Sequence, residues 1–275
     1  MFVLKKYLKL ISVISLCLII SMIVIIAAGC SSNGEKLAAI KDSGKLSVYT
    51  DPNFPPFEFH GADGVVGVDI EIGKAIAEEL GVEMVIEESE FDAILMAIKG
   101  GKGDIAITGM TIRDDRKESV DFSVPYINSV QYLILPENSE IAIMEDLKGK
   151  TVGVALGYTG QFLMEDELDA DIEGVLAGSG TEIREYPSAM EAMLDMKNGR
   201  NDAVVMDEYV AKNIAANNSG LKAVELRYQS GEIASEEYGV VVAKGNEDLL
   251  KIIDKVIKRL IDEDKIREWV IKYSE

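Results

Sequence analysis

A short run of threonines, a glycine and arginines is the part of this sequence best suited to bind a small charged molecule. The run is TGMTIRDDR at residues 108–116, and it follows a predicted strand. It should therefore lie at the carboxyl end of a parallel sheet, where ligands of open α/β folds collect. Gly109 allows close backbone approach, Thr111 offers a hydroxyl and an N–H group, and Arg116 offers a planar pair of donors suited to a carboxylate. The spacing equally allows Arg113 and Arg116 to pair with neighbouring acidic residues on a helix surface.

Signatures of catalytic or metal sites are mostly missing. The single histidine, His60, precedes Gly61 in an apparent turn, so a histidine-based triad or a multi-histidine metal site is not easily built. The run GGKG at residues 100–103 lacks the spacing and the following Ser or Thr of a phosphate-binding loop, and is better explained as a turn. We therefore expect a binding protein without enzymatic activity, metal or cofactor.

The elements that must position these residues alternate between short β-rich runs and amphipathic helical patterns. Such alternation predicts βαβ units and mainly parallel sheets, which is an α/β fold. The predicted strands are 46–50, 82–87, 104–108, 151–155 and 202–206, and the predicted helices are 69–80, 91–99, 161–168 and 188–198.

Two segments of the chain resemble each other. In residues 91–107 and again in residues 189–205, an amphipathic helix ends at a glycine-bearing turn and leads into an aspartate-led buried strand. This similarity predicts two related α/β lobes. Residues 246–273 carry apolar residues at helical spacing that need a surface to cover, and Trp269 and Tyr273 are expected to fix the end of this helical segment.

The N-terminus has the features of a bacterial secretion signal with a lipid-attachment site. Lysines precede an uncharged apolar stretch over residues 10–28, and Ala27-Ala28-Gly29-Cys30 resembles a lipobox with alanine in place of the usual leucine. We expect a signal peptide over residues 1–29 and a tether over residues 30–37 that starts at a lipidated, palmitate-bearing Cys30. The globular part would lie on the extracytoplasmic face of the cell membrane. The apolar stretch is also long enough to remain as an uncleaved anchor.

The charge balance argues against nucleic acid as a partner. Removal of residues 1–29 takes away three lysines and no acid, so 28 basic and 48 acidic residues become 25 and 48, a net charge of −23. Binding to phosphate backbones requires a basic surface. This acidity suits a solvated surface, and it could also attract cationic ligands. Cys17 would leave with the signal and Cys30 would carry lipid, so a mature chain has no internal disulfide and depends on core burial.

Several runs, in the right order, resemble the family 3 periplasmic solute-binding proteins for polar amino acids. The resemblance covers nearly all of residues 40–275. It implies a two-lobe periplasmic-binding-protein fold of type II, in which each lobe is a mainly parallel sheet flanked by helices and two hinge strands join the lobes. The runs are TDPNFPPFEF at 50–59, GVDIE at 67–71, TGMTIRDDR at 108–116, VDFS at 120–123, GVALGYTG at 153–160 and DAVVMD at 202–207.

The resemblance also implies how the two charged ends of an amino acid are held. Arg116 corresponds to the arginine that grips the ligand α-carboxylate, with Thr111 and the backbone of Thr159 completing that cradle. Gly109, through its carbonyl, and Asp207 correspond to the partners of the α-ammonium. A zwitterion that leaves water needs a cation at one end and a carboxylate at the other. Asp207 could also cap a helix, since an apolar strand precedes it and a helical run follows.

The ligand side chain is expected to lie between two aromatic residues. By the resemblance, Phe54 and Phe91 sandwich it, and Asp51 lies beside them. Core packing is the alternative for both phenylalanines. The three prolines between residues 52 and 56 favour an exposed, rigid loop over a core strand, which would place Phe54 at the edge of a pocket.

The resemblance further implies that the chain crosses between the lobes near residues 126–130 and 234–238. The first lobe would combine residues 38–127 with 238–275, and residues 128–237 would form the second. A bound amino acid would bridge the lobes, and the permease of an ABC importer would recognise the closed form. We expect a monomer.

The identity of the ligand is less clear from the sequence. Asp51 resembles the acid that meets a cationic side chain, which favours arginine, lysine or histidine, although glutamine binders can carry this aspartate too. Met206 stands where several histidine- and glutamine-binding relatives have a polar residue. Met206 thus argues against a close copy of a histidine or glutamine binder. The alternative within the same family is a glutamine- or cystine-binding protein. Two rivals of other classes are an extracytoplasmic cyclohexadienyl dehydratase on the same scaffold and a receptor that reports ligand to a sensor kinase.

Overall fold

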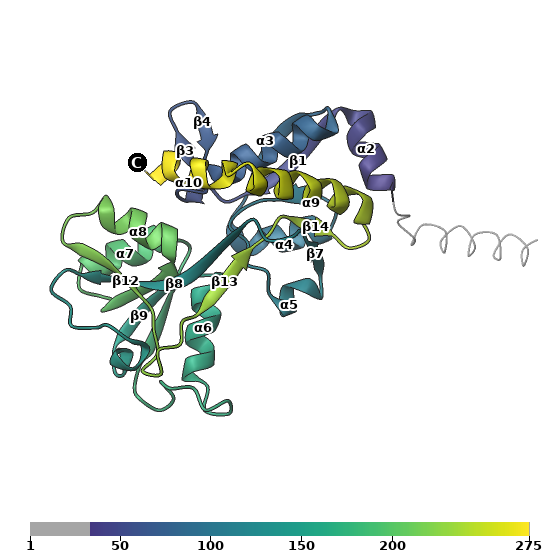
Figure 1. The fold of residues 1–275 in the computed structure, drawn as a ribbon. Helices are drawn as coiled ribbons and strands as arrows, with labels where there is room; N and C mark the ends of the chain where they lie inside the picture. The colour runs from purple at the N-terminus through teal and green to yellow at the C-terminus, as the bar shows by residue number, and fades with distance from the viewer. Residues whose placement is uncertain (1–33, 275) are drawn as a thin grey trace, which may run out of the picture.

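The computed structural model describes residues 34–274, which fold into two α/β lobes joined by neighbouring strands (Figure 1). The three parallel strands on one side of the first sheet match the expected βαβ pattern. The two strands on its other side are added antiparallel, and one of them comes from near the C-terminus. In spatial order the strands of this sheet are β5 (Glu83–Glu88), β1 (Lys45–Thr50), β6 (Ile105–Ala106), β14 (Val241–Ala243) and β7 (Val120–Phe122).

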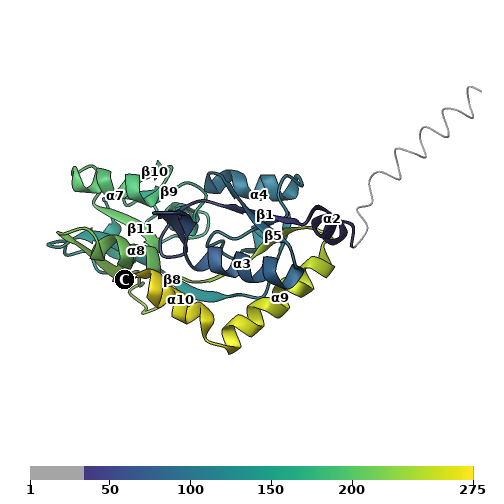
Figure 2. The same ribbon diagram turned by 90° about the horizontal axis from the view of Figure 1, so that it is seen from above.

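Helices cover both faces of the first sheet (Figure 2). Helix α3 buries Ile72 and Ile76, which recur at helical spacing, and it ends at Gly81, whose φ of 72° suits a glycine. The helices of this lobe are α2 (Glu35–Ser43), α3 (Val68–Leu80), α4 (Phe91–Lys99), α5 (Asp114–Lys117), α9 (Glu247–Asp262) and α10 (Lys265–Ser274).

The C-terminal helical stripe forms two helices rather than one. The chain turns between α9 and α10 at Asp264, which has a φ of 57° and therefore cannot continue an α-helix. The hydroxyl of Tyr273 on α10 donates to Glu71 on α3 over 2.6 Å, and Trp269 packs partly buried against the core. These two residues fix the chain end to the first lobe, as expected.

A small antiparallel sheet that the sequence did not predict covers the start of α3. It consists of β2 (Asn53–Phe54), β3 (Glu58–Gly61) and β4 (Gly64–Val66). His60 was expected in a turn, but it lies within β3 and the turn comes after Gly61. Its imidazole is 61% exposed and lies 3.4 Å from Glu88, far from any catalytic arrangement.

The second lobe has the same arrangement of strands as the first. Three of its strands, β10, β9 and β11, are parallel, and the two following strands of the sheet are antiparallel. In spatial order the sheet contains β10 (Glu182–Tyr186), β9 (Thr151–Ala155), β11 (Ala203–Asp207), β8 (Ile127–Pro136) and β12 (Leu221–Glu225). Its helices are the 3₁₀ helix η1 (Met144–Leu147), α6 (Thr159–Leu168), α7 (Ala189–Lys197) and α8 (Glu208–Ala216).

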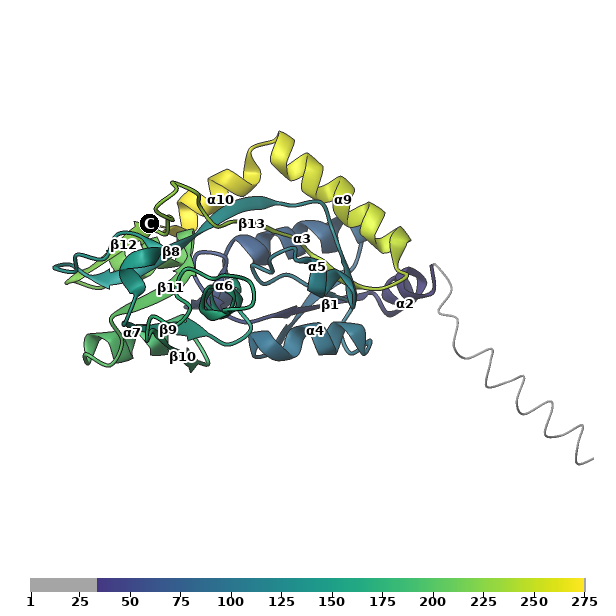
Figure 3. The ribbon, with the colours of Figure 1, turned by 90° about the horizontal axis from the view of Figure 1, so that it is seen from below.

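The internal similarity of the sequence is visible as matching elements. Helix α4 leads into β6 in the first lobe, and α7 leads into β11 in the second. Both helices lie on the same side of the molecule, whereas α9 and α10 run along the opposite side (Figure 3).

The two predicted crossings pair with each other. The first half of β8 is antiparallel to β13 (Ser235–Tyr238), with Ser235 opposite Val130 and Tyr238 opposite Ile127. The second half of β8 continues into the sheet of the second lobe. In the sheets of the two lobes, each antiparallel pair contains either β8, which carries the chain between the lobes, or β14, which directly follows the return crossing, and parallel pairing is confined to the βαβ units.

The larger of two buried apolar clusters extends across both lobes, from Leu46 in β1 to Val204 in β11. Between residues 34 and 274 the structure contains no helix long and apolar enough to cross a bilayer. The predicted signal peptide, Cys30 and the first part of the tether lie outside the described residues.

Candidate amino acid-binding site

Arg116 is buried where the two lobes meet. Only 5% of its surface is exposed. Its Nη1 donates to the carbonyl of Thr111 and its Nη2 to the carbonyl of Gly157 in the second lobe, both over 2.8 Å. Burial and then the nearby charge of Arg113 lower the pKa of Arg116 to about 10, so it stays protonated at neutral pH. The surface ion pair considered as an alternative forms at Arg113, which contacts Asp115 over 3.0 Å.

Thr111 and Thr159 meet across the interface between the lobes. Thr159 is the first residue of α6, and its hydroxyl donates to the hydroxyl of Thr111 over 2.8 Å. The first N–H groups of a helix have no partner within it, and the helix dipole favours negative charge there. The structure thus places the predicted carboxylate-binding residues Arg116, Thr111 and Thr159 together.

Asp207 ends β11 and occupies the position before α8, but its side chain does not cap that helix. It is 3% exposed and points instead towards the hinge strands. Its Oδ1 accepts from Nε2 of Gln131 over 2.7 Å and its Oδ2 from the hydroxyl of Tyr238 over 2.6 Å. Burial raises the pKa of Asp207, although these hydrogen bonds and the charge of Arg116 act against the rise.

Phe54 and Phe91 both contact Tyr158, which the second lobe contributes. The ring centroid of Tyr158 lies 4.3 Å from that of Phe91 and 5.7 Å from that of Phe54. All three rings belong to the apolar cluster that spans the lobes. The predicted aromatic pair is therefore part of a three-ring group, to which each lobe contributes.

The proline-rich loop before β3 is buried rather than exposed. Pro52 and Pro56 are buried, and Asn53 is the exposed residue of this segment. The small sheet and the buried rings of Phe54 and Phe57 hold the loop against the first lobe. The expectation of an exposed loop was therefore wrong, because the rings of Phe54 and Phe57 turn this segment inward.

Asp51 lies at the start of this loop with 2% of its surface exposed. Its Oδ1 accepts from Nδ2 of Asn53 over 2.6 Å, whereas its Oδ2 is buried without a hydrogen-bond partner. Burial raises the pKa of Asp51, against the hydrogen bond from Asn53. A buried acceptor without a partner is costly, so this oxygen is suited to a donor that a ligand brings.

Gly109 contacts one member of a pair of buried carboxyls, Asp69 and Glu58. Its φ is 52°, and a Cβ here would lie 2.3 Å from Cε1 of Phe54. Its N–H donates to Asp69 over 2.7 Å. Burial raises the pKa of Asp69 to about 6, and burial together with the charge of Asp69 raises the pKa of Glu58 well above its usual value. Asp69 and Glu58 each keep one buried oxygen without a partner, and a proton shared between these oxygens would satisfy both.

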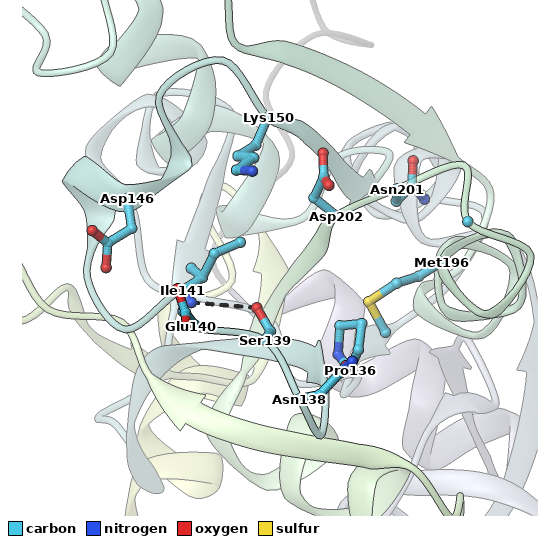
Figure 4. Close-up of a pocket in the computed structure, with 11 residues that line it drawn as sticks. Pro136, Asn138, Ser139, Glu140, Ile141, Asp146, Lys150, Met196, Asn201 and Asp202 are labelled. Carbon is cyan, nitrogen blue, oxygen red and sulfur yellow. Dashed lines mark hydrogen bonds between the residues drawn. The ribbon is translucent and has the colours of Figure 1, made fainter.

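A cavity of about 440 Å³ opens between the lobes, and of the eight predicted site residues Thr159 alone lines it. A second cavity, of about 580 Å³, lies within the second lobe (Figure 4). Its Lys150 and Asp202 stand at the amino ends of β9 and β11, at the opposite edge of the sheet from Thr159 and Asp207, so it is not the predicted site. The first cavity is lined by Ile112, Arg113, Asp114, Asp115, Gln131, Thr159, Phe162, Leu163, Asp166, Ala234 and Ser235.

Sequence reasoning missed several residues of this site. Tyr158 stands beside Thr159 in one of the runs that carry the family resemblance, so its position was a signal that went unused. Gln131 and Glu236 lie on the paired hinge strands, and only the pairing of β8 with β13 brings them to the site. Among residues 34–274, no group of three or more histidines, cysteines, aspartates and glutamates could hold a metal ion.

Most of the chain matches one family of known proteins. Residues 46–275 match the model of the bacterial extracellular solute-binding proteins, family 3. The chain belongs to this family. Its two-lobe α/β architecture is the type II periplasmic-binding-protein fold, as expected from the sequence.

Curated and solved relatives bind amino acids. The L-cystine-binding protein TcyJ of Escherichia coli K12 is 34% identical over 228 residues, which are 82% of this chain and 80% of TcyJ. The arginine-binding extracellular protein ArtP of Bacillus subtilis is 28% identical over 90% of this chain and 91% of its own length. The solved structure of the substrate-binding protein AbpA of Streptococcus pneumoniae, bound to L-arginine, is 32% identical with a TM-score of 0.77, over 86% of this chain and 97% of AbpA.

Proposed function

We propose that this family 3 solute-binding protein captures a free amino acid between its lobes and delivers it to the permease of an ABC importer. The observation that carries the proposal is the meeting of Arg116 from the first lobe and Asp207 from the second in one hydrogen-bonded network. A buried cation and a buried carboxylate at one interface suit the two charged ends of an α-amino acid. Arg116, Thr111 and Thr159 would hold the carboxylate, and Asp207 with the carbonyl of Gly109 the ammonium.

The buried charges favour a cationic side chain, with arginine as the first candidate. Within residues 34–274 the buried ionisable groups other than tyrosines are five acidic side chains, of Asp51, Glu58, Asp69, Asp207 and Glu236, and one guanidinium, of Arg116. The free oxygen of Asp51 and the faces of Phe54 and Phe91 would receive a guanidinium, which stacks well on aromatic rings. The L-arginine bound to AbpA supports this choice.

Ligand binding would act by stabilising the closed arrangement of the lobes. Contacts that cross the interface include Arg116 to Gly157, Thr111 to Thr159, and the guanidinium of Arg113, which lies 3.7 Å from the ring centroid of Phe162. A ligand held by groups of both lobes gains its full set of contacts only when the lobes are closed. The closed shape is then the signal that a permease reads.

We also propose a location and lobe boundaries for the protein. Removal of residues 1–29 and lipidation of Cys30 would anchor it to the outer face of the cell membrane through the tether over residues 30–37. The first lobe would comprise residues 38–127 and 238–275, and the second lobe residues 128–237. The pairing of β8 with β13 supports placing both crossings at the hinge. The protein would act as a monomer, because one chain supplies both ends of the site.

Thermal-shift screening of residues 31–275 against the common amino acids tests the function. A ligand that binds only the folded state at 100 times its Kd adds about 2.7 kcal/mol to the free energy of unfolding. For a protein of this size that corresponds to a rise in melting temperature of about 5 to 10 °C. We expect the largest rise with L-arginine. No rise with any amino acid, after unfolding and refolding to remove carried ligand, would refute the proposal.

Two alternatives predict separate outcomes. A cystine-binding protein is favoured by the similarity to TcyJ, and it would respond to L-cystine more than to arginine. A cyclohexadienyl dehydratase would turn over prephenate or arogenate rather than bind an unchanged amino acid. The retention of both Arg116 and Asp207, which match an intact α-amino acid, favours binding without chemistry.

A further inference from the structure

Glu236 is a buried carboxyl on the hinge that lies between the two ends of the proposed site. It stands on β13 with 6% of its surface exposed. Its Oε2 accepts from the hydroxyl of Thr111 over 2.7 Å, and its Oε1 accepts from Nε2 of Gln131 over 2.8 Å. Glu236 therefore contacts a residue of the carboxylate cradle on one side and the hinge strand β8 on the other.

Glu236 and Asp207 share one donor group. Nε2 of Gln131 donates to Oε1 of Glu236 and also to Oδ1 of Asp207. The charged or titratable groups that face this pair are the guanidinium of Arg116, from α5, the phenol of Tyr238, from β13, and the phenol of Tyr158, which directly precedes α6. Arg116 donates to two carbonyl groups and to neither carboxyl, so within residues 34–274 its charge acts on the pair without a direct ion pair.

We propose that Glu236 is a second acidic group of the ammonium site, and that it shares one proton with Asp207 until an amino acid binds. This inference rests on the proposed function. The α-ammonium then takes the place of the shared proton, the two carboxylates face the ligand, and the proton leaves to water. Capture of an amino acid is thereby coupled to the release of a proton.

The electrostatics agree with this geometry. Burial raises the pKa of Glu236 well above its usual value, and the charge of Asp207 adds to the rise. An ammonium beside the pair lowers the pKa of both carboxyls. The free protein therefore holds more protons than the complex, and affinity must rise with pH until the free pair has ionised.

Calorimetry of the full chain in detergent tests the coupling. Titrations with L-arginine in buffers of different ionisation enthalpy, between about pH 5 and pH 8, give the number of protons released. We expect up to one proton per ligand and an association constant that rises up to tenfold per pH unit. Glu236→Gln should reduce the release to near zero and flatten the pH profile. Glu237→Gln, which removes the neighbouring exposed carboxylate, should behave as the unaltered protein does.

The outcomes separate this inference from the proposed function. Arginine binding without proton release in the unaltered protein would overturn the inference and leave the proposed function standing. Release that persists in Glu236→Gln would overturn the role of Glu236. The measurement on the unaltered protein does not depend on the variant, so it decides even where the variant folds poorly. Absence of binding by any amino acid at any pH would refute both proposals.

Discussion

Replacing Arg116 with alanine should nearly abolish amino acid binding. The side chain is 5% exposed, so solvent screens its charge little, and both of its donating nitrogens lie at the interface between the lobes. Leaving the partner of a buried charge unpaired costs about 3 to 5 kcal/mol. Since about 1.4 kcal/mol corresponds to a factor of ten, the Kd for arginine should rise about 150- to 4000-fold.

Isothermal titration calorimetry measures this change, with circular dichroism to check that the fold is retained. Lys117→Ala is the matched control, because Lys117 stands on the same short helix but is exposed and pairs with Asp114. We expect its Kd to stay within about twofold of the unaltered protein, since exposed ion pairs contribute little. An Arg116→Ala protein that is folded and loses less than about tenfold in affinity would refute the assignment of Arg116 to the carboxylate.

Three further variants test other parts of the structure. Arg113→Ala should raise the Kd about 2- to 30-fold in calorimetry, because it removes the stacking on Phe162 that helps to hold the lobes together; an unchanged Kd would exclude that contribution. Gly109→Ala should lower the melting temperature by about 2 to 8 °C, because its φ of 52° and the ring of Phe54 at 2.3 Å leave no room for a Cβ, and equal stability would contradict this geometry. The raised pKa values of Glu58 and Asp69 mean that this buried pair stabilises the unaltered protein at low pH, and that this contribution is lost as pH rises from about 4 through about 6. The melting temperature of Glu58→Gln should therefore fall less than that of the unaltered protein across this pH range. An identical slope of melting temperature against pH would count against the shared proton.

Elements with strong local signals could be predicted from the sequence. The helix over residues 91–99 and the strand over residues 151–155 have the predicted bounds, and both are set by apolar periodicity. The small sheet could not be predicted, because its strands of two to four residues are too short for a periodic pattern and lie in a segment rich in proline. The break between α9 and α10 could not be predicted for a different reason. The apolar stripe continues through both helices, and Asp264 alone adopts the left-handed conformation that separates them.

Some residues of the candidate site could likewise be predicted from the sequence, and others could not. Arg116 and Asp207 could be proposed because a family resemblance links distant positions that periodicity cannot link. Glu236 carried no local signal, since its contact with Thr111 joins positions 125 residues apart, and only the register of the hinge strands creates it. The contact of Phe54 with Tyr158 likewise joins the two lobes, at positions far apart in the chain.

The place of β14 in the first sheet determines when that sheet can be completed during synthesis. This strand, made of residues 241–243, lies between β6 and β7 and pairs with both, although it emerges from the ribosome more than a hundred residues after them. Until it arrives, β6 and β7 have no partner between them and the first sheet ends in an open edge. Apart from the hinge strand β13, the strands of the second sheet and the helices of that lobe come from residues 127–225, so they are available earlier. The lobe that is synthesised first is thus the lobe that is completed last.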